Sequence, residues 1–456
     1  MTLTDQQNIY EGVRGTSIKI LNRIERTDAY LDKLLDAELR SKDLSDLDKS
    51  LLNEIVHGVI RWRSRLDWVI NGFYHGNYVK SEINLKNAMR VATYQILFLQ
   101  KIPHHAAVNE AVEFIKRLNG EKAANLVNAV LRTIIRNIDE IKFPDPATDT
   151  VHYLGVYYAH PTWMVKKWLA RFGFEETQKL LLANNQIPEI TIRINRLKIE
   201  PAKFLSSLEE SKLSYQGSEY IDYYLRVRNL SELSELNYFQ SGYFTIQDES
   251  AALPSILLNP QPCERVIDMC AAPGGKTTHL AELMKNSGKI IAIDKYDHKL
   301  NLIRTSCDRL GIDIVDYVVG DASELELESA DKILVDVPCS GLGVLRKKPD
   351  IKWKREPDDL LKLNVFQTGL LNNAAKLLKP GGAIVYSTCT TEPEENFNLI
   401  QDFLKKHTDF YIDNASKYVN QALVNSNGCV ETFTYKHHMD GSFAVRLVKS
   451  SQLSDK

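Results

Sequence analysis

Cysteine is scarce in this chain. Six of the 456 residues are cysteines, and none occurs before Cys263. So few thiols spread over this length do not form the dense disulfide framework of a small secreted protein. A reducing cytoplasm is therefore the expected compartment, where free thiols remain available for chemistry.

Long apolar runs and an excess of one charge are also missing. No uninterrupted apolar stretch approaches the roughly 18–20 residues that span a bilayer. The opening residues MTLTDQQNIYEGVRG lack the basic and apolar parts of a signal peptide. The formal net charge of −2 argues against attraction of the whole molecule to nucleic acid, although local basic patches can still bind phosphates. We expect no membrane partner, and the sequence does not indicate the oligomeric state.

The first part of the chain, residues 1–140, has the pattern of helices. Apolar residues recur at three- and four-residue spacing in 104–118 and again in 123–138, which predicts two amphipathic helices. The proline-containing segment 141–150 is typical of a linker. An all-α domain is therefore predicted over residues 1–140.

The middle part, residues 151–245, mixes the two patterns. A helix is predicted from Pro161 to Gly173, because proline favours the first turn and glycine the end of a helix. Residues 190–195 (ITIRIN) alternate apolar and polar side chains as a half-buried strand does, and 201–211 again suggests a helix. Together they predict a small α+β subdomain.

The last part, residues 246–456, alternates apolar strand-like segments with helical ones. Such alternation predicts an α/β domain with a parallel, doubly wound sheet, a Rossmann-like fold. Parallel strands are buried on both faces, which explains their continuous apolar character. The expected strands are RVIDMC, KIIAID, DYVVGDA, KILVDVP and AIVYSTC, and SFAVRLVK is expected to close the sheet late in the chain.

The segment DMCAAPGGKTTHL (268–280) lies between a predicted strand and a predicted helix. Its GGKTT resembles the end of an NTPase phosphate loop, whose pattern is G-x-x-x-x-G-K-[ST]. The first glycine of that pattern would be residue 270, which is Cys270, and Pro273 has no backbone N–H to donate to a phosphate. The turn therefore favours another ligand, and an NTPase is kept as an alternative that ligand binding can test.

Acidic residues end the next two predicted strands. Asp294 follows Gly274 by about 20 residues, the spacing at which a carboxylate reaches ribose hydroxyls, and Asp321 is placed to bind an adenine amino group. Each feature alone is typical of an ordinary turn or a solvated cap. Because parallel strands place their carboxyl ends at one edge of the sheet, the set predicts a site for an adenosine compound with a free ribose.

Two cysteines and an aspartate follow the fourth and fifth strands at the same edge: Asp336 and Cys339 in VDVPCSGLG, and Cys389 in YSTCT. A lone buried cysteine is more often a small hydrophobic residue, and neither cysteine belongs to a C-x-x-C pair, so no metal site is predicted. A free thiol with a pKa of about 8.5 becomes a nucleophile when a cation or a helix N-terminus stabilises its thiolate. With a carboxyl group to bind a ring nitrogen, this set suits methylation of a pyrimidine at C5.

Four motifs, DMCAAPGGKTTH, DVPCSGLG, KPDIKW and YSTCTTEPEEN, resemble those of the RsmB/Nop2/Sun family of RNA 5-methylcytosine methyltransferases. The helical first 140 residues resemble the NusB-like RNA-binding domain of the bacterial subgroup that modifies small-subunit ribosomal RNA. HPTW at 160–163 resembles a segment between the two parts. Lys348 stands where the family usually has histidine, and STCT where STCS is commoner.

The resemblance implies S-adenosylmethionine as cofactor and an unpaired or flipped cytosine of small-subunit rRNA as substrate. It implies that Cys389 is the nucleophile that adds to cytosine C6, that Cys339 assists elimination, and that Asp336 lies at the junction of cofactor and cytosine. Asp294 would bind the ribose and Asp321 the adenine. The cofactor turn would consist of Cys270, Ala271, Ala272, Pro273, Gly274, Gly275 and Lys276.

Cations surround the KPDIKW motif, which follows the Asp336–Cys339 motif directly. Arg346, Lys347, Lys348 and Lys352 are therefore predicted to bind RNA phosphates, whereas the plainer hypothesis for any charge run is a solvated face. A non-catalytic RNA-binding protein with a vestigial methyltransferase fold is the other alternative. Such a protein would be expected to have lost one of the three catalytic side chains.

Overall fold

The computed structural model describes residues 9–41, 44–227 and 237–451. The chain divides into two compact units, and each is described separately. The first consists of residues 1–186 together with 345–354, and the second of 187–344 together with 355–456. The chain therefore passes from one unit to the other three times.

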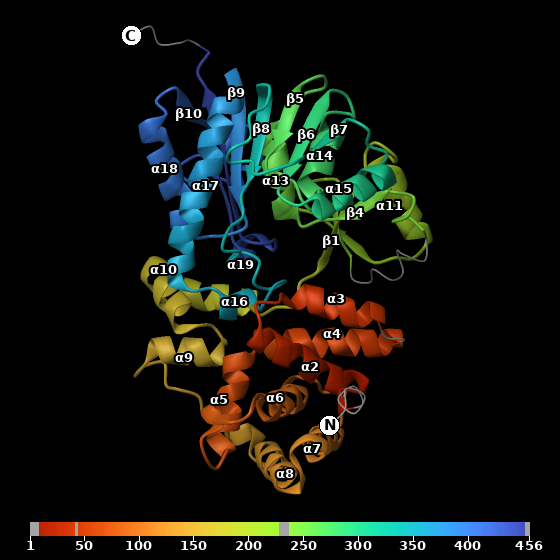
Figure 1. Cartoon of the computed structure of the whole chain (residues 1–456), viewed down its shortest axis with the longest axis vertical. Helices are drawn as coiled ribbons and strands as arrows, with labels where there is room; N and C mark the ends of the chain where they lie inside the picture. The colour runs from red at the N-terminus through yellow and green to blue at the C-terminus, as the bar shows by residue number, and fades with distance from the viewer. Residues whose placement is uncertain (1–8, 42–43, 228–236, 452–456) are drawn as a thin grey trace. The chain divides into compact units, whose positions relative to one another are not determined.

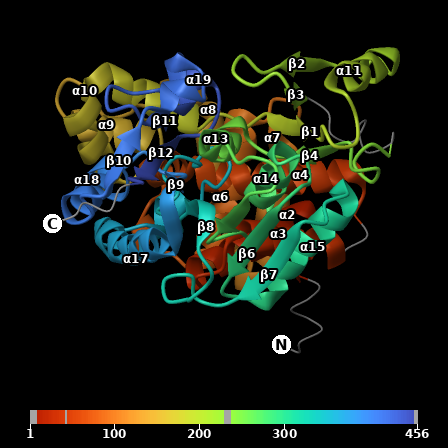
Figure 2. The same cartoon turned by 90° about the horizontal axis from the view of Figure 1, so that it is seen from above.

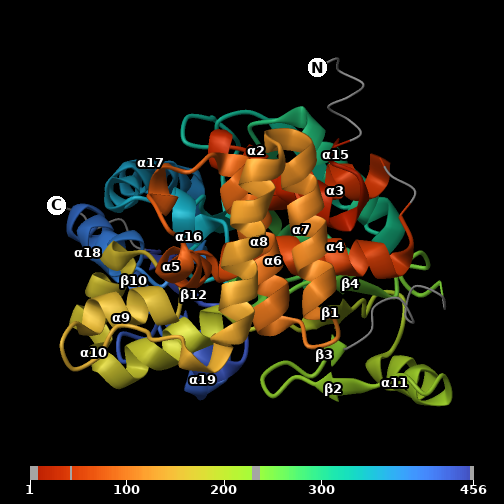
Figure 3. The same ribbon diagram turned by 90° about the horizontal axis from the view of Figure 1, so that it is seen from below.

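The first unit is helical, as the apolar periodicity predicts. Helices α7 (His104–Asn119) and α8 (Glu121–Arg136) are the two amphipathic helices expected from the sequence, and Figure 3 shows them side by side. Their buried stripes pack into one core with α2 and α4–α6. The remaining bounds are α2 (Gly12–Arg26), α3 (Leu31–Ser41), α4 (Asp46–Arg61), α5 (Arg63–Phe73), α6 (Ile83–Phe98), α9 (Thr150–Tyr157), α10 (Thr162–Asn184) and α16 (Ile351–Lys354).

Gly173 interrupts α10, which is in effect two helices. Its φ of 74° and ψ of −177° are not helical, and glycine adopts this left-handed φ without the steric cost that a Cβ atom would bring. The prediction that a helix ends at Gly173 is therefore confirmed, and a second helical stretch follows it, which the sequence analysis did not predict.

The second unit begins with a small antiparallel sheet in the order β2-β3-β1-β4. The predicted strand 190–195 is β1 (Ile190–Ile194), and the predicted helix after it is α11 (Pro201–Glu210). The other strands are too short to give a clear periodic pattern: β2 (Tyr215–Gly217), β3 (Tyr224–Val227) and β4 (Phe244–Ile246).

The large sheet has the order β10-β12-β9-β8-β5-β6-β7, with β11 paired to β12. The five expected strands are parallel neighbours. SFAVRLVK, expected as a late strand of this sheet, is β12, and it runs antiparallel between β9 and β10. The bounds are β5 (Arg265–Asp268), β6 (Lys289–Asp294), β7 (Val315–Val319), β8 (Ala330–Asp336), β9 (Leu378–Thr388), β10 (Phe410–Asp413), β11 (Val430–Thr432) and β12 (Ser442–Lys449).

Helices cover both faces of the large sheet (Figures 1 and 2). On one face α13 (Glu249–Leu258), α14 (Gly275–Leu283) and α15 (Asp297–Leu310) pack on side chains such as Val266 and Ile290. On the other, α17 (Pro357–Leu377) and α18 (Phe397–Lys406) pack on Ile267, Ile291 and their neighbours. The alternation of consecutive residues between two cores explains the continuous apolar strands in the sequence. A short helix, α19 (Thr434–His437), precedes β12.

The strand order places a topological switch point between β5 and β8. From β5 the chain proceeds to β6 and β7 on one side, then returns to form β8 on the other side of β5. Loops that leave neighbouring strands in opposite directions open a crevice at the carboxyl edge, where α/β proteins bind ligands. The loops after β5 and β8 hold the glycine turn and the Asp336–Cys339 motif, respectively.

Candidate active site at the carboxyl edge of the large sheet

The glycine turn connects β5 to α14. Gly274, with a φ of 103°, precedes the first residue of α14, Gly275. A Cβ atom on Gly274 would lie 3.1 Å from side-chain atoms of Ile303, and one on Gly275 would lie 3.3 Å from Nε2 of Gln247. A side chain at either position would therefore press on its neighbours, and the positive φ of Gly274 favours glycine there as well.

Two carboxylates lie at the ends of the next two strands of the sheet, β6 and β7. Asp294 is the last residue of β6, and its Oδ1 accepts a hydrogen bond from the backbone N–H of Tyr296 at 3.1 Å. Asp321 follows β7, and hydrogen bonds from Ser323 lower the pKa of its carboxyl group. Ribose hydroxyls and an adenine amino group are donors, so ionised acceptors at these positions fit an adenosine compound.

The two cysteines of the later motifs lie in contact. The sulfur atoms of Cys339 and Cys389 are 3.1 Å apart, and the backbone N–H of Cys389 donates to the sulfur of Cys339 at 3.3 Å. Cys389 is exposed, whereas Cys339 is half-buried. The hydrogen bond to Cys389, together with burial, raises the pKa of the Cys339 thiol well above its ordinary value. These two causes therefore favour the protonated form of the Cys339 thiol.

Lys276 joins the glycine turn to the aspartate after β8. Its Nζ is 2.7 Å from Oδ2 of Asp336, and Oδ1 of Asp336 accepts a hydrogen bond from the hydroxyl of Ser387 at 2.7 Å. Burial lowers the pKa of Lys276, but the charges of Asp336 and Cys389 raise it and outweigh burial. Lys276 is thus a cation that interacts electrostatically with both Asp336 and Cys389.

A buried network holds the loop that carries Cys339. The carboxylate of Glu395 accepts hydrogen bonds from the backbone N–H and the hydroxyl of Ser340, and from the side-chain amide of Gln367. Arg355 donates to the carbonyl oxygens of Ser340 and Cys339. The two cysteine loops are therefore fixed to each other behind the sulfurs, which keeps the reacting atoms in place.

The four cations predicted to bind RNA are not equivalent. Lys348 is exposed and Lys347 is half-buried, but Arg346 is 8% exposed and Lys352 is 0% exposed. The side-chain nitrogen Nζ of Lys352 donates to the carbonyl oxygens of Arg61 and Ala159 and to Oδ1 of Asn185, at 2.8–3.0 Å. The prediction is therefore corrected at Lys352 and Arg346, whose side chains face the protein and not a solvent-exposed phosphate.

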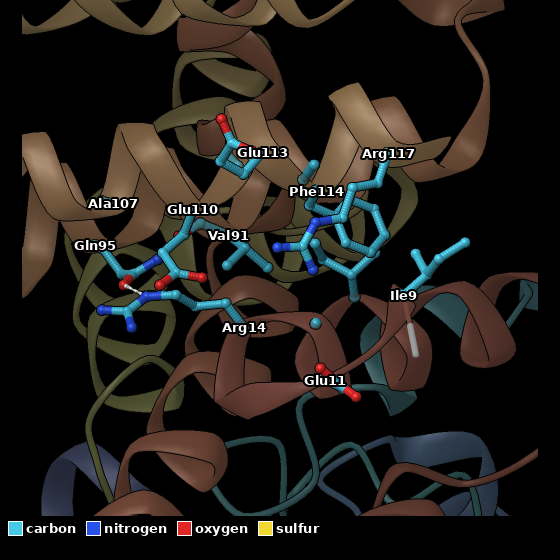
Figure 4. A pocket seen from close by; sticks show the side chains of 14 residues that line it. Ile9, Glu11, Arg14, Val91, Gln95, Ala107, Glu110, Glu113, Phe114 and Arg117 are labelled. Carbon is cyan, nitrogen blue, oxygen red and sulfur yellow. Dashed lines mark hydrogen bonds between the residues drawn. The ribbon is translucent and has the colours of Figure 1, made fainter. Parts of the chain in front are cut away.

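A second concave feature is a small cavity among α2, α6 and α7, drawn in Figure 4. Its volume is about 60 Å³, and in it Arg14 donates to the side-chain oxygen of Gln95 at 2.9 Å. Small-molecule sites have volumes of roughly 300–1,000 Å³, so this cavity holds a few water molecules at most. It is not a site for a nucleoside.

Two further features of the described residues bear on function. None of their helices is both long and apolar enough to cross a membrane. No group of three or more histidine, cysteine, aspartate or glutamate side chains in that part of the chain is arranged to hold a metal ion.

The sequence analysis missed several residues of this site. Asp268, Ser387 and Glu395 lie inside motifs that were quoted for the resemblance, but only the structure shows what they contact. Arg355 follows the KPDIKW motif, and its contacts with the loop of Cys339 were not predicted. Arg193 lies in another subdomain altogether, and no local pattern connects it with the glycine turn.

Family models match three parts of the chain. The model for 16S rRNA methyltransferase RsmB/F matches residues 255–448. The NusB family model matches residues 12–136, and the model for the ferredoxin-like domain of RsmF/B-like methyltransferases matches residues 160–232. The chain thus combines a helical NusB-like region with a mixed-sheet, Rossmann-like methyltransferase domain.

Two relatives and one solved structure match this chain over most of its length, and a second structure matches a shorter part. A probable ribosomal RNA small subunit methyltransferase B of Bacillus subtilis is 36% identical, covering 88% of this chain and 90% of the relative. One of Synechocystis is 34% identical, covering 96% and 99%. Among structures, PH0851 has a TM-score of 0.77 at 28% identity, covering 95% of this chain and 98% of that one. NSun6 from Pyrococcus horikoshii, solved with the adenosylmethionine analogue SFG, has a TM-score of 0.56 at 25% identity, covering 63% and 97%. The chain belongs to the RsmB family of small-subunit ribosomal RNA methyltransferases.

Proposed function

We propose that this protein methylates C5 of a specific cytosine in small-subunit (16S) ribosomal RNA through a covalent bond between Cys389 and cytosine C6. The observation that carries the proposal is the contact between the sulfurs of Cys339 and Cys389, beside the Lys276–Asp336 pair. S-adenosylmethionine, the cofactor of this family, supplies the methyl group when bound. The cytosine is unpaired or flipped out of its helix, because C5 and C6 are poorly accessible within a duplex.

Cys389 is the nucleophile of this proposal. It is the more exposed of the two cysteines, and Lys276 supplies a nearby positive charge. Its thiolate forms a bond to C6, and the electrons of the C5–C6 double bond make C5 nucleophilic. Ring nitrogen N3 becomes more basic in this step and takes up a proton from water, and its N–H then donates to the carboxylate of Asp336, which Lys276 and Ser387 hold in place. C5 then accepts the methyl group.

Cys339 is the base that completes the reaction. While Cys389 is free, the hydrogen bond between the sulfurs raises the pKa of Cys339. Once the sulfur of Cys389 is bonded to C6 it carries no negative charge, so this cause of the raised pKa disappears. Cys339 then releases its thiol proton to solvent water, and its thiolate takes the proton from C5. The electrons of the C5–H bond restore the C5–C6 double bond, and the Cys389–C6 bond breaks with its electrons leaving on the sulfur of Cys389.

The cofactor site of the proposal is the crevice at the switch point. The turn from Cys270 to Lys276 lines it, Asp294 binds the ribose hydroxyls and Asp321 binds the adenine amino group. The positions of Asp294, at the end of β6 beside β5, and of Asp321, after β7 beside β6, support this assignment. Burial raises the pKa of Cys270, so this third cysteine stays protonated and takes no part as a nucleophile.

The RNA-binding part of the proposal rests on the first unit and the loop after Cys339. We assign phosphate contacts to Lys347 and Lys348, the accessible members of the predicted group. We also propose domains over 1–140, 151–245 and 246–456, which the three matched ranges support. Residues 151–186 and 345–354 are the exceptions, because they fold with the helical unit.

Replacing each cysteine separately tests the reaction. Cys389→Ala is expected to abolish methylation of 16S rRNA while the protein still binds the cofactor. Cys339→Ala is expected to stop after methyl transfer and to accumulate an RNA–protein adduct that survives denaturing electrophoresis. Bisulfite sequencing of ribosomal and transfer RNA from cells with and without the gene identifies the cytosine. Turnover by Cys389→Ala would exclude it as the nucleophile, and an adduct formed only by Cys389→Ala would exchange the two roles.

A further inference from the structure

Arg193 lies in the small antiparallel sheet, yet its guanidinium group ends at the cofactor turn of the large one. It belongs to β1, and its side chain is 0% exposed. One nitrogen, Nη1, donates to the carbonyl oxygen of Gly275 at 2.8 Å. The other, Nη2, donates to the hydroxyl of Thr278 at 3.0 Å and to Oε1 of Glu282 at 2.8 Å. One side chain therefore binds three residues on one face of α14.

The contacts reach the first glycine of the turn as well. The hydroxyl of Thr278, which accepts from Arg193, donates to the carbonyl oxygen of Gly274 at 2.9 Å. A guanidinium group is planar and rigid, so its two nitrogens fix the carbonyls of Gly274 and Gly275 relative to each other. The amide groups at the start of α14 are oriented by the same peptide planes.

Two more residues of the small sheet support this arrangement. The side-chain oxygen of Gln247, just after β4, accepts a hydrogen bond from Arg193 and one from the hydroxyl of Tyr224 at 2.7 Å. Tyr224 is paired with Arg193 across β1 and β3. Gln247 also packs against Gly275. Three strands of the small sheet thus converge on the first turn of α14.

The two sheets also share one apolar core. Buried side chains of β1 and β3, such as Ile192 and Leu225, belong to the same cluster as Leu280 of α14 and Val266 of β5. The buried Arg193–Glu282 ion pair lies within this layer. Because burial removes both groups from water, each charge is compensated mainly by the other. Movement of the small sheet is therefore transmitted directly to the cofactor turn.

We propose that Arg193 is a positioning residue for S-adenosylmethionine, and that the small sheet sets the affinity for the methyl donor by holding Gly274 and Gly275. This inference rests on the proposed assignment of the glycine turn to the cofactor. It gives the middle subdomain a role in cofactor binding that its place in the chain does not suggest.

The experiment compares Arg193→Met with Arg446→Met. Arg446 is also buried and ion-paired, to Asp413 at 3.1 Å, and also donates to main-chain carbonyls, those of Leu257 and Leu258. Its bonds do not involve the glycine turn, so it controls for the loss of a buried arginine. Calorimetric titration with S-adenosylmethionine is expected to give a Kd raised about tenfold or more for Arg193→Met. Arg446→Met should stay within about twofold of the wild type while its Tm falls.

Further variants keep the test decisive. Thr278→Val removes the link to Gly274 but keeps the ion pair, so it tests the inference if Arg193→Met does not fold. Arg193→Lys, which keeps the charge and part of the bonding, should recover part of the affinity. In turnover, the KM for S-adenosylmethionine should rise in Arg193→Met while the KM for RNA stays unchanged.

The outcomes separate this inference from the function on which it rests. Asp294→Ala removes a proposed ribose ligand directly. If it binds S-adenosylmethionine as the wild type does, the proposed cofactor site is wrong. If Asp294→Ala loses affinity while Arg193→Met and Thr278→Val retain it, the cofactor site stands and the positioning role of Arg193 is overturned.

Discussion

Asp268 illustrates how burial changes a single ionisable group near the reaction site. It ends β5 directly before the glycine turn and is 1% exposed. The hydroxyl of Thr277 donates to its Oδ2 at 2.7 Å. Burial, with a contribution from the charge of Asp336, raises the pKa of Asp268 to about 7. Its carboxyl group is therefore protonated in the folded protein over a pH range in which it is ionised in the unfolded chain.

This raised pKa has a consequence for stability. Between the unfolded pKa of 3.8 and the folded pKa of about 7, the folded state holds a proton that the unfolded state has lost, so the contribution to stability falls as pH rises. Asp268→Asn keeps the shape without the titration. As the pH rises from about 5.5 to about 8, the free energy of unfolding of the variant should increase by about 2 kcal/mol relative to that of the wild type. Urea unfolding of the two cofactor-free proteins over this pH range measures the difference. If their free energies of unfolding changed with pH in the same way, the prediction would be contradicted.

At the scale of secondary-structure elements, the sequence predicts the helices and strands that are long enough to show a local pattern of apolar residues. The parallel strands were predictable because each is a continuous apolar run, and their ends correctly place Asp294 and Asp336 at one edge of the sheet. The antiparallel β10 and β11 have four and three residues, too few for a period to emerge. Contacts made across the fold, such as that of Arg193 with Gly275, leave no signal in the residues around them.

The segment 345–354 is a second case in which the local sequence does not reveal contacts made across the fold. Its sequence, LRKKPDIKWK, has the composition of a solvated basic loop, yet Lys352 is fully buried and the indole N–H of Trp353 donates to the carbonyl oxygen of Ile60 at 2.8 Å. The oxygens that bind Lys352 come from positions far away in the chain. Only the tertiary structure separates this lysine from Lys348, its exposed neighbour.

Replacing these two lysines should therefore affect different properties: stability in the case of Lys352 and RNA binding in the case of Lys348. Lys352→Ala leaves three buried oxygens without their donor and is expected to cost about 2–5 kcal/mol of stability. Lys348→Ala should change stability by less than about 0.5 kcal/mol but reduce the slope of log RNA affinity against log salt concentration by about one. Denaturant unfolding and salt-dependent RNA binding measure the two effects. Wild-type stability of Lys352→Ala would contradict the burial, and an unchanged slope for Lys348→Ala would remove it from the RNA contacts.

At the scale of the whole molecule, the two units are not consecutive segments of chain. The helical unit is completed by residues 345–354, although the residues on either side of them belong to the other unit. Trp353 packs on the helical core, and Asp350 accepts a hydrogen bond from the backbone N–H of Leu31 at 3.3 Å. The loop that follows the Cys339 motif is thereby part of the fold of the helical unit, so the helical unit is not formed by residues 1–186 alone.

The helical unit should consequently be incomplete when it is cut from the rest of the chain. A fragment of residues 1–186 lacks Lys352 and Trp353, which leaves the carbonyl oxygens of Arg61 and Ala159 without a buried donor. A synthetic peptide of residues 344–355 should bind the fragment and raise its Tm in proportion to the logarithm of peptide concentration, because a ligand of the folded state stabilises it by mass action. The same peptide with Lys352→Ala is the control and should raise the Tm much less. A fragment whose Tm does not change with either peptide would show that the helices form a complete fold without the segment.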